Sequence, residues 1–148
     1  MNSKYLIRTT LVLSIILMVI LLPLDAYCAN DGCTKSYVSL VFGIFGIFIG
    51  GNETLTWYAN PLLFLAWLFL LIRKPKLSLI LSIVSTLVAL SFLTFDEIVI
   101  NEAGHQAPIT KYALGYWLWI GSHTIMVIGN VFILLYEHHS SFKNTSNL

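Results

Sequence analysis

The stretch Arg73-Lys74-Pro75-Lys76 decides the fold, because it is a dense cluster of positive charge between two long apolar runs. Basic residues gather on the cytoplasmic side of membrane proteins, so such a cluster indicates the side on which the flanking segments end and begin. We therefore predict the topology from Arg73, Lys74 and Lys76.

The composition is typical of a multi-pass membrane protein. Of the 148 residues, 57% are hydrophobic and only 10% are charged, and the apolar runs are long enough to span lipid. The formal net charge is +1, which supplies no basic surface for nucleic acid. We expect a single integral membrane domain over residues 1–148 that has the lipid bilayer as a partner and binds no nucleic acid.

The runs on either side of the cluster predict spanning helices over about residues 57–73 and 77–95. The second of them carries Ser78, Ser82 and Ser85 on one face. We call these three residues the serine seam, and a seam of small residues favours close helix packing in lipid.

Two further spanning helices are predicted over about residues 5–24 and 115–136. The first could instead be a signal peptide, because it has a positive start and an apolar middle, and Ala26-Tyr27-Cys28 could serve as a cleavage site. We favour an uncleaved helix, since the apolar run is longer than a usual signal core.

The last predicted helix carries two stripes. His123, Asn130 and Glu137 lie seven residues apart and share one face, which would suit a proton or ion path. We favour the alternative, in which His123 and Asn130 hydrogen-bond to the serine seam. The second stripe contains only small residues and predicts close packing: Gly115, Ser122 and Gly129.

Residues 37–51 form an apolar run that is short for a membrane span and rich in glycine. Gly43, Gly46 and Gly50 recur at helical spacing, which would give a helix here one bare face for close packing. We interpret this segment as an interfacial or re-entrant helix that does not cross the membrane.

The charges support four crossings with both termini in the cytoplasm. That arrangement places six basic residues inside, namely Lys4, Arg8, Arg73, Lys74, Lys76 and Lys143, and two outside, namely Lys35 and Lys111. A fifth crossing by residues 37–51 would separate the cluster from Lys4 and Arg8. The predicted fold is an all-α, four-helix transmembrane bundle with outer loops at 25–36 and 96–114 and a loose cytoplasmic tail at 137–148.

The outer segments contain the candidate chemistry. Cys28 and Cys33 flank the turn-forming residues Asn30-Asp31-Gly32, so a loop outside the cytoplasm would form a local disulfide. A redox-active pair is the alternative, although such pairs more often have two intervening residues. The second outer loop combines acids with an imidazole, and we interpret it as a solvated loop or a partner contact: Asp96, Glu97, Glu102 and His105.

No metal site or cofactor is predicted. His105 belongs to an outer loop, whereas Glu137, His138 and His139 belong to the inner tail, so they cannot share a metal ion. The sequence also contains no nucleophile elbow, phosphate-binding loop or metalloprotease helix pattern.

Three stretches resemble a loose group of small, uncharacterised bacterial inner-membrane proteins that have the same order of segments. They are Trp57-Tyr-Ala-Asn-Pro-Leu-Leu63, Ile100-Asn-Glu-Ala-Gly104 and Gly115-Tyr-Trp-Leu-Trp119. The resemblance covers most of residues 37–136. It implies residence in the bacterial inner membrane and implies no activity.

Without a catalytic pattern, the sequence favours a non-enzymatic protein that acts by contact with a partner. The partner would be another membrane protein or a membrane-active toxin, which makes the chain an accessory subunit or an immunity-type protein. Two alternatives remain: a membrane thiol-disulfide oxidoreductase that uses Cys28 and Cys33, and a small proton-coupled transporter that uses His123, Asn130 and Glu137.

Overall fold

The computed structural model describes residues 3–30, 32–49, 51–100 and 103–145, without the side chains of residues 46–49 and 141–145. Within these residues, four helices are long and apolar enough to cross a membrane. Their cores are α1 (Ser3–Leu21), α3 (Ala59–Leu71), α4 (Pro75–Ser91) and α5 (Leu114–Thr145). The 3-10 helix η1 (Asn52–Tyr58) leads into α3, and the 3-10 helix η2 (Phe92–Thr94) extends α4.

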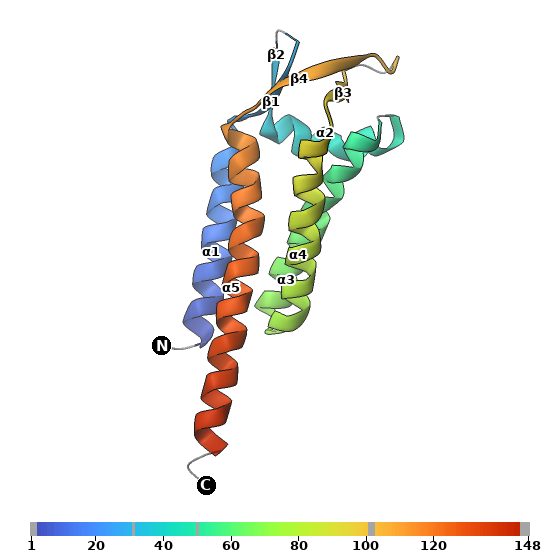
Figure 1. Cartoon of the computed structure of the whole chain (residues 1–148). Helices are drawn as coiled ribbons and strands as arrows, with labels where there is room; N and C mark the ends of the chain where they lie inside the picture. Colours follow the sequence, from blue (N-terminus) through green and yellow to red (C-terminus); the bar gives the residue numbers. More distant parts are fainter. Residues whose placement is uncertain (1–2, 31, 50, 101–102, 146–148) are drawn as a thin grey trace.

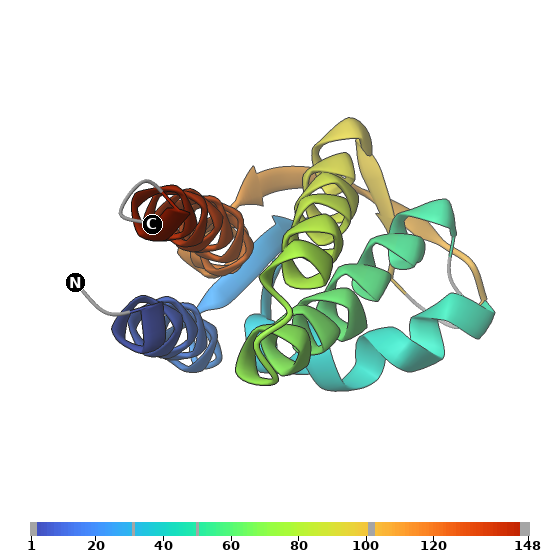
Figure 2. The same cartoon turned by 90° about the horizontal axis from the view of Figure 1, so that it is seen from below.

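The four helices form two pairs, α1 with α5 and α3 with α4 (Figure 1). The view along the bundle shows that α5 is also the neighbour of α4 (Figure 2). The start of α1, the end of α5 and the turn between α3 and α4 all lie at one end of the molecule (Figure 1). The basic cluster is in that turn, so it shares an end with both ends of the described chain.

The turn between α3 and α4 is tight. Arg73 has a φ of 59°, a left-handed conformation that is uncommon for residues other than glycine, and it reverses the chain direction. The Lys74 amide donates to the Phe69 carbonyl at 2.8 Å. Pro75 then occupies the first turn of α4, where its missing N–H costs no helical hydrogen bond.

Small and hydroxyl side chains hold α1 against α5. Ser14 Oγ donates to the Ser122 carbonyl and Ser122 Oγ donates to the Ser14 carbonyl, each at 3.0 Å. About two helical turns further along α5, a methyl group at Gly129 would collide with the side chain of Thr10. Trp67 in α3 also donates to Ser14 Oγ, at 2.9 Å, which joins the two helix pairs.

The all-α prediction is wrong in one respect, because the two outer segments contain a four-stranded sheet with the order β2-β1-β4-β3. The strands are β1 (Asp25–Ala29), β2 (Gly32–Lys35), β3 (Glu97–Val99) and β4 (Gln106–Tyr112). All three pairings are antiparallel, and β1 pairs with both its hairpin partner and the distant β4. This long-range pairing provides hydrogen-bond partners for backbone N–H and C=O groups of both segments. Turn residues in the sequence act locally and did not predict it.

Helix α2 (Ser36–Ile49) lies across the sheet end of the bundle and is not parallel to the other helices (Figure 1). It covers most of the predicted glycine-rich segment. At the other end of the chain, the prediction of a loose tail from residue 137 is wrong up to Thr145, because α5 continues to that residue. The tail contains no glycine or proline before Thr145, so nothing in its backbone chemistry stops the helix.

Candidate functional site

A cavity of about 430 Å³ lies where the sheet and α2 meet the bundle. Its wall is formed by the end of α1, the starts of α3 and α5, helix α2, both 3-10 helices and the strands β1, β2 and β3. Aromatic side chains make up much of this wall: Tyr27, Phe42, Trp57, Phe92, Tyr116 and Trp119.

A small hydrophobic cluster fixes the sheet to the bundle beside the cavity. Phe92, Ile98 and Tyr116 are its buried members. The hydroxyl of Tyr116 donates to the Ala89 carbonyl at 3.1 Å, and the rings of Phe92 and Tyr116 are 5.7 Å apart. These contacts set the distance between the sheet and the helix ends, and therefore the depth of the cavity.

Trp57 holds α2 in place on the opposite side. Its indole N–H donates to the Leu40 carbonyl at 2.8 Å. Gly43 lies against the same ring, and a methyl group there would collide with it. Among the three glycines predicted to form a packing face, Gly43 thus contacts a tryptophan side chain. The surroundings of Gly46 are not described, and Gly50 lies outside the described residues.

Asn60 connects the start of α3 to α5. Its side-chain oxygen accepts from the indole N–H of Trp119 at 2.9 Å, and its amide nitrogen donates to the Trp57 carbonyl at 3.1 Å. The indole N–H groups of Trp57 and Trp119 therefore both donate to protein acceptors. Only their ring faces and edges remain for contact with a molecule in the cavity.

Glu53 is the acidic residue of the cavity wall, and its residue surface is only 4% exposed. Its Oε1 accepts from the Val99 amide at 3.0 Å, which links η1 to the sheet. Gly51 packs directly against the carboxylate, because a methyl group there would collide with it. Burial raises the pKa of the Tyr27 phenol, hydrogen bonds with Thr34 and Ser39 partly offset this shift, and the nearby negative charge of Glu53 adds to it. No motif in the sequence pointed to Glu53 as a site residue.

Two hydroxyl groups at the start of α2 complete the polar part of the wall. Ser36 Oγ is buried and has no hydrogen-bond partner among the described residues, whereas the Ser39 hydroxyl lies beside the Tyr27 phenol. A buried polar atom without a partner is costly, so Ser36 favours a bound polar group that can hydrogen-bond to its hydroxyl.

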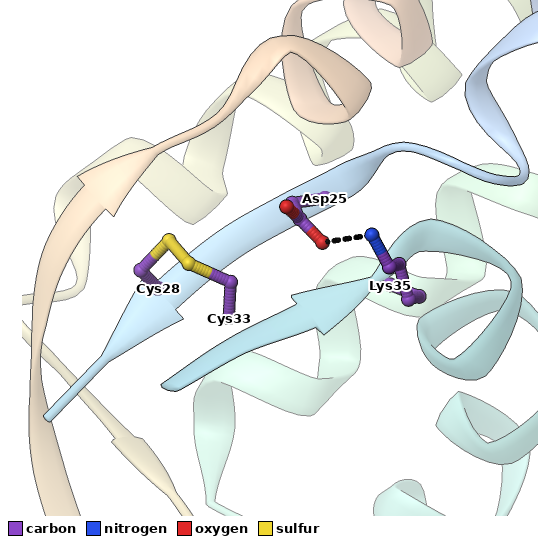
Figure 3. A network of polar contacts seen from close by, with 4 residues as sticks. All are labelled: Asp25, Cys28, Cys33 and Lys35. Carbon is purple, nitrogen blue, oxygen red and sulfur yellow. Dashed lines mark ion pairs between the residues drawn. A yellow bond between two sulfur atoms is a disulfide. The ribbon is translucent and has the colours of Figure 1, made fainter. Parts of the chain in front are cut away.

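The predicted cysteine pair lies on the β1–β2 hairpin (Figure 3). Cys28 and Cys33 are directly opposite each other in the strand register and are joined as a disulfide. The ion pair between Asp25 and Lys35, at 2.8 Å, ties the other end of the same hairpin. Neither cysteine is among the described residues that line the cavity.

The structure places Asn130 against the serine seam. Its amide nitrogen donates to Ser78 Oγ at 2.9 Å and to the Met126 carbonyl at 2.8 Å, with Ser82 Oγ at 3.3 Å. Ser78 Oγ itself donates to the Ala66 carbonyl, so its lone pairs are available to the amide. Ser85, the third seam residue, donates to the Ala59 carbonyl at 2.8 Å.

His123 does not reach the serine seam. Its Nδ1 is 2.7 Å from the Trp119 carbonyl of its own helix, and its ring meets the Trp119 ring edge-on. Glu137 accepts from Ser3 Oγ at 3.1 Å, at the end of the bundle away from the sheet. Within the described residues, no hydrogen bond joins His123, Asn130 and Glu137 into the relay that a proton path would need.

The structure separates the other predicted residues. Asp96, Glu97 and His105 are exposed beside the sheet, and Glu102 lies outside the described residues. Gly115 packs against Ser36 and the Asp25 carbonyl, so it lets α5 begin close to β1. The basic residues Arg73, Lys74 and Lys76 line a shallow hollow with Glu137. No group of three potential metal ligands occurs in the described part of the chain.

No protein-family model, no curated protein and no solved structure matches this chain. The geometry of the cavity is therefore the basis for the function proposed next.

Proposed function

We propose that this is a non-catalytic, multi-pass protein of the bacterial inner membrane that acts by binding, and that the cavity is its binding site for an amphipathic small molecule. One observation carries the proposal: a cavity of about 430 Å³ with a largely apolar wall and a few convergent polar groups. This size and composition are typical of small-molecule sites, which usually occupy about 300–1,000 Å³.

The position of the cavity favours a ligand that comes from the membrane surface. Aromatic residues that suit the boundary between lipid and water surround this end of the bundle, including Tyr58 and Trp117. Two apolar residues of the cavity wall, Phe42 and Ile100, are 58% and 50% exposed. An amphiphile could place its chain among these side chains while its head group enters the wall.

The charge distribution supports an outward-facing cavity. Both ends of the described chain and the basic cluster share the end opposite the sheet, which agrees with a cytoplasmic location for all three. We expect a reporter fused beside Lys74 to be active only on the cytoplasmic side. A periplasmic reporter signal there would overturn this orientation.

Native mass spectrometry of the protein, released gently from its own membrane, tests the binding function. We expect a co-purified small molecule on the wild type. Ser39→Phe should fill the cavity and lose that molecule, whereas Val41→Phe adds the same ring to the exposed side of α2 and should keep it. The proposal fails if the wild type carries nothing, or if both variants retain the molecule equally.

A protein partner is a second candidate, which makes the chain an accessory subunit or an immunity-type protein. The observation in its favour is the outer face of β4, where Gln106, Pro108 and Thr110 are exposed and alternate with the buried Ala107. A photo-crosslinker at Thr110 should then give a protein adduct that is missing when the crosslinker replaces the exposed Ile80 of α4. Equal yields at both positions would count against a specific partner.

A further inference from the structure

The buried carboxylate of Glu53 calls for a positive partner. Removing a charge from water is costly unless an opposite charge or several hydrogen bonds compensate. Among the described residues that line the cavity, Glu53 is the sole charged side chain, and no lysine, arginine or histidine faces it. Among the described residues, the Val99 backbone amide donates to it.

The aromatic wall is suited to the same kind of partner. Rings attract a cation to their faces, and an aromatic cage is a common site for ammonium groups. Trp57, Trp119 and Tyr116 donate their N–H or O–H groups to protein acceptors, so they offer the cavity their π systems. Tyr27 adds a further ring close to Glu53, and this ring is tilted against that of Phe92 with the ring centroids 5.6 Å apart.

Ser36 adds a buried hydroxyl to the cavity wall that can accept a hydrogen bond from a head group. A primary ammonium group carries three N–H donors and no acceptor. Glu53 can accept one of them, and Ser36 Oγ is a buried oxygen of the same cavity without a partner among the described residues. A neutral head group of similar size could fill the space but would leave the carboxylate without an opposite charge.

We infer that the cavity binds an amphiphile with a protonated amine as its head group, with Glu53 as the counter-charge and the aromatic rings around it. The hydrocarbon chain then lies along the apolar wall formed by Met18, Leu21 and Leu40. This inference rests on the proposed binding function and specifies the ligand class. The ammonium group could belong to a free long-chain amine or to the head group of an ethanolamine phospholipid.

Tryptophan fluorescence of the purified protein in maltoside micelles at pH 7 provides the test, since a long-chain amine keeps its proton there. The titrants are dodecylamine and its neutral derivative N-dodecylacetamide. The key variant is Glu53→Gln, whose side-chain oxygen can still accept from the Val99 amide. The matched control is Glu97→Gln, which removes an equal charge from the exposed side of β3.

We expect saturable binding of dodecylamine that weakens about tenfold or more in Glu53→Gln and stays within about twofold of wild type in Glu97→Gln. Binding of N-dodecylacetamide should be weaker in the wild type and nearly equal in all three proteins, which also shows that Glu53→Gln is folded. Equal dodecylamine affinity in wild type and Glu53→Gln would overturn the inference, as would equal weakening in both variants or loss of both titrants in Glu53→Gln.

The failure of the inference and the failure of the proposed function remain distinguishable. If N-dodecylacetamide binds as well as dodecylamine, the cavity binds amphiphiles without recognising charge, and only the inference fails. If neither binds saturably, the proposed function fails as well. A parallel titration with lysophosphatidylethanolamine identifies the source, because binding that depends on Glu53 indicates a phospholipid head group and its absence indicates a free amine.

Discussion

The interior of the helix bundle and the sheet end of the molecule solve the problem of buried polar groups in different ways. In the bundle, small side chains bring helices close enough to satisfy one another, as Ser14 and Ser122 do by reciprocal hydrogen bonds. At the sheet end, large aromatic side chains meet irregular backbone and a buried carboxylate, and they enclose a cavity. The bundle is therefore a scaffold, whereas the sheet end can admit a ligand.

The difference follows from side-chain size. Serine and glycine let two helix backbones approach until no space remains between them, which favours close packing in lipid. Tryptophan and tyrosine hold neighbouring elements apart, and each ring can contact a ligand while its polar atom bonds to the protein. Changes in the bundle should thus reduce stability, while changes in the cavity wall should mainly alter binding.

The largest effect should come from the close contact between α1 and α5 at Gly129. Gly129→Ala places a methyl group into the side chain of Thr10 and should lower the free energy of unfolding by up to about 3 kcal/mol. Gly121→Ala is the matched control, because its methyl group would meet only the flexible end of Leu17 at 3.3 Å. Circular dichroism during denaturation in mixed micelles measures both variants. An equal loss of stability in the two variants would show that α1 and α5 are not closely packed at Gly129.

The hairpin disulfide should matter next, and its effect should stay at the sheet end. The sequence separation is 5 residues, and closing so short a loop is worth about 2 kcal/mol. We expect the double change Cys28→Ser and Cys33→Ser to speed hydrogen exchange in β1 and β2 and to leave α3 and α4 unchanged.

Measuring activity and hydrogen exchange of the same double variant distinguishes a structural disulfide from a redox-active one. If the pair were redox-active, a disulfide-dependent activity would vanish while protein abundance and hydrogen exchange stayed at wild-type levels. Faster exchange throughout the bundle would instead contradict the separation between the two regions.

Asn130 should have a moderate effect within the bundle. Asn130→Ala removes its hydrogen bonds to Ser78 and the Met126 carbonyl and should cost about 1.5 kcal/mol. A double-mutant cycle with Ser78→Ala isolates the pair, and binding of the cavity ligand should not change. A coupling energy of zero would mean that Asn130 acts only by filling space.

The smallest effect should be the coupling between Ser14 and Ser122. Hydrogen bonds between membrane helices average about 0.6 kcal/mol, because alternative partners exist before the helices pack. The cycle of Ser14→Ala, Ser122→Ala and the double variant should give a value of that size. A much larger coupling would show that this pair, rather than the glycine contact at Gly129, determines how α1 pairs with α5.

Much of the helical architecture could be predicted because a span is a local property. Long apolar runs without charge must be helices in lipid, since every backbone polar group has to be satisfied within the segment. Four such helices are present in the described residues, and the one continuous helix that sequence reasoning ended early, α5, runs on to Thr145. Its polar end lacks a breaking residue, and composition alone suggested a loose tail.

The sheet and the cavity could not be predicted in the same way. Strand β1 pairs with β4, with Tyr27 opposite Tyr112. Local sequence patterns do not predict a strand partner that lies so far along the chain. No sequence motif points to Glu53, but η1 places it in the cavity wall, where it accepts from the Val99 amide. A lone acid directly before an apolar run was the available signal, and it acquires meaning only from its neighbours.

The sequence by itself determined the number of apolar helices and the proximity of Cys28 to Cys33, because length, hydropathy and turn chemistry act over a few neighbouring residues. The tertiary structure decided which groups meet across the chain: Asn130 with the serine seam, β1 with β4, and Glu53 with an aromatic wall. Those contacts depend on packing between segments that are distant in the sequence. For that reason the candidate binding site became visible only in the folded molecule.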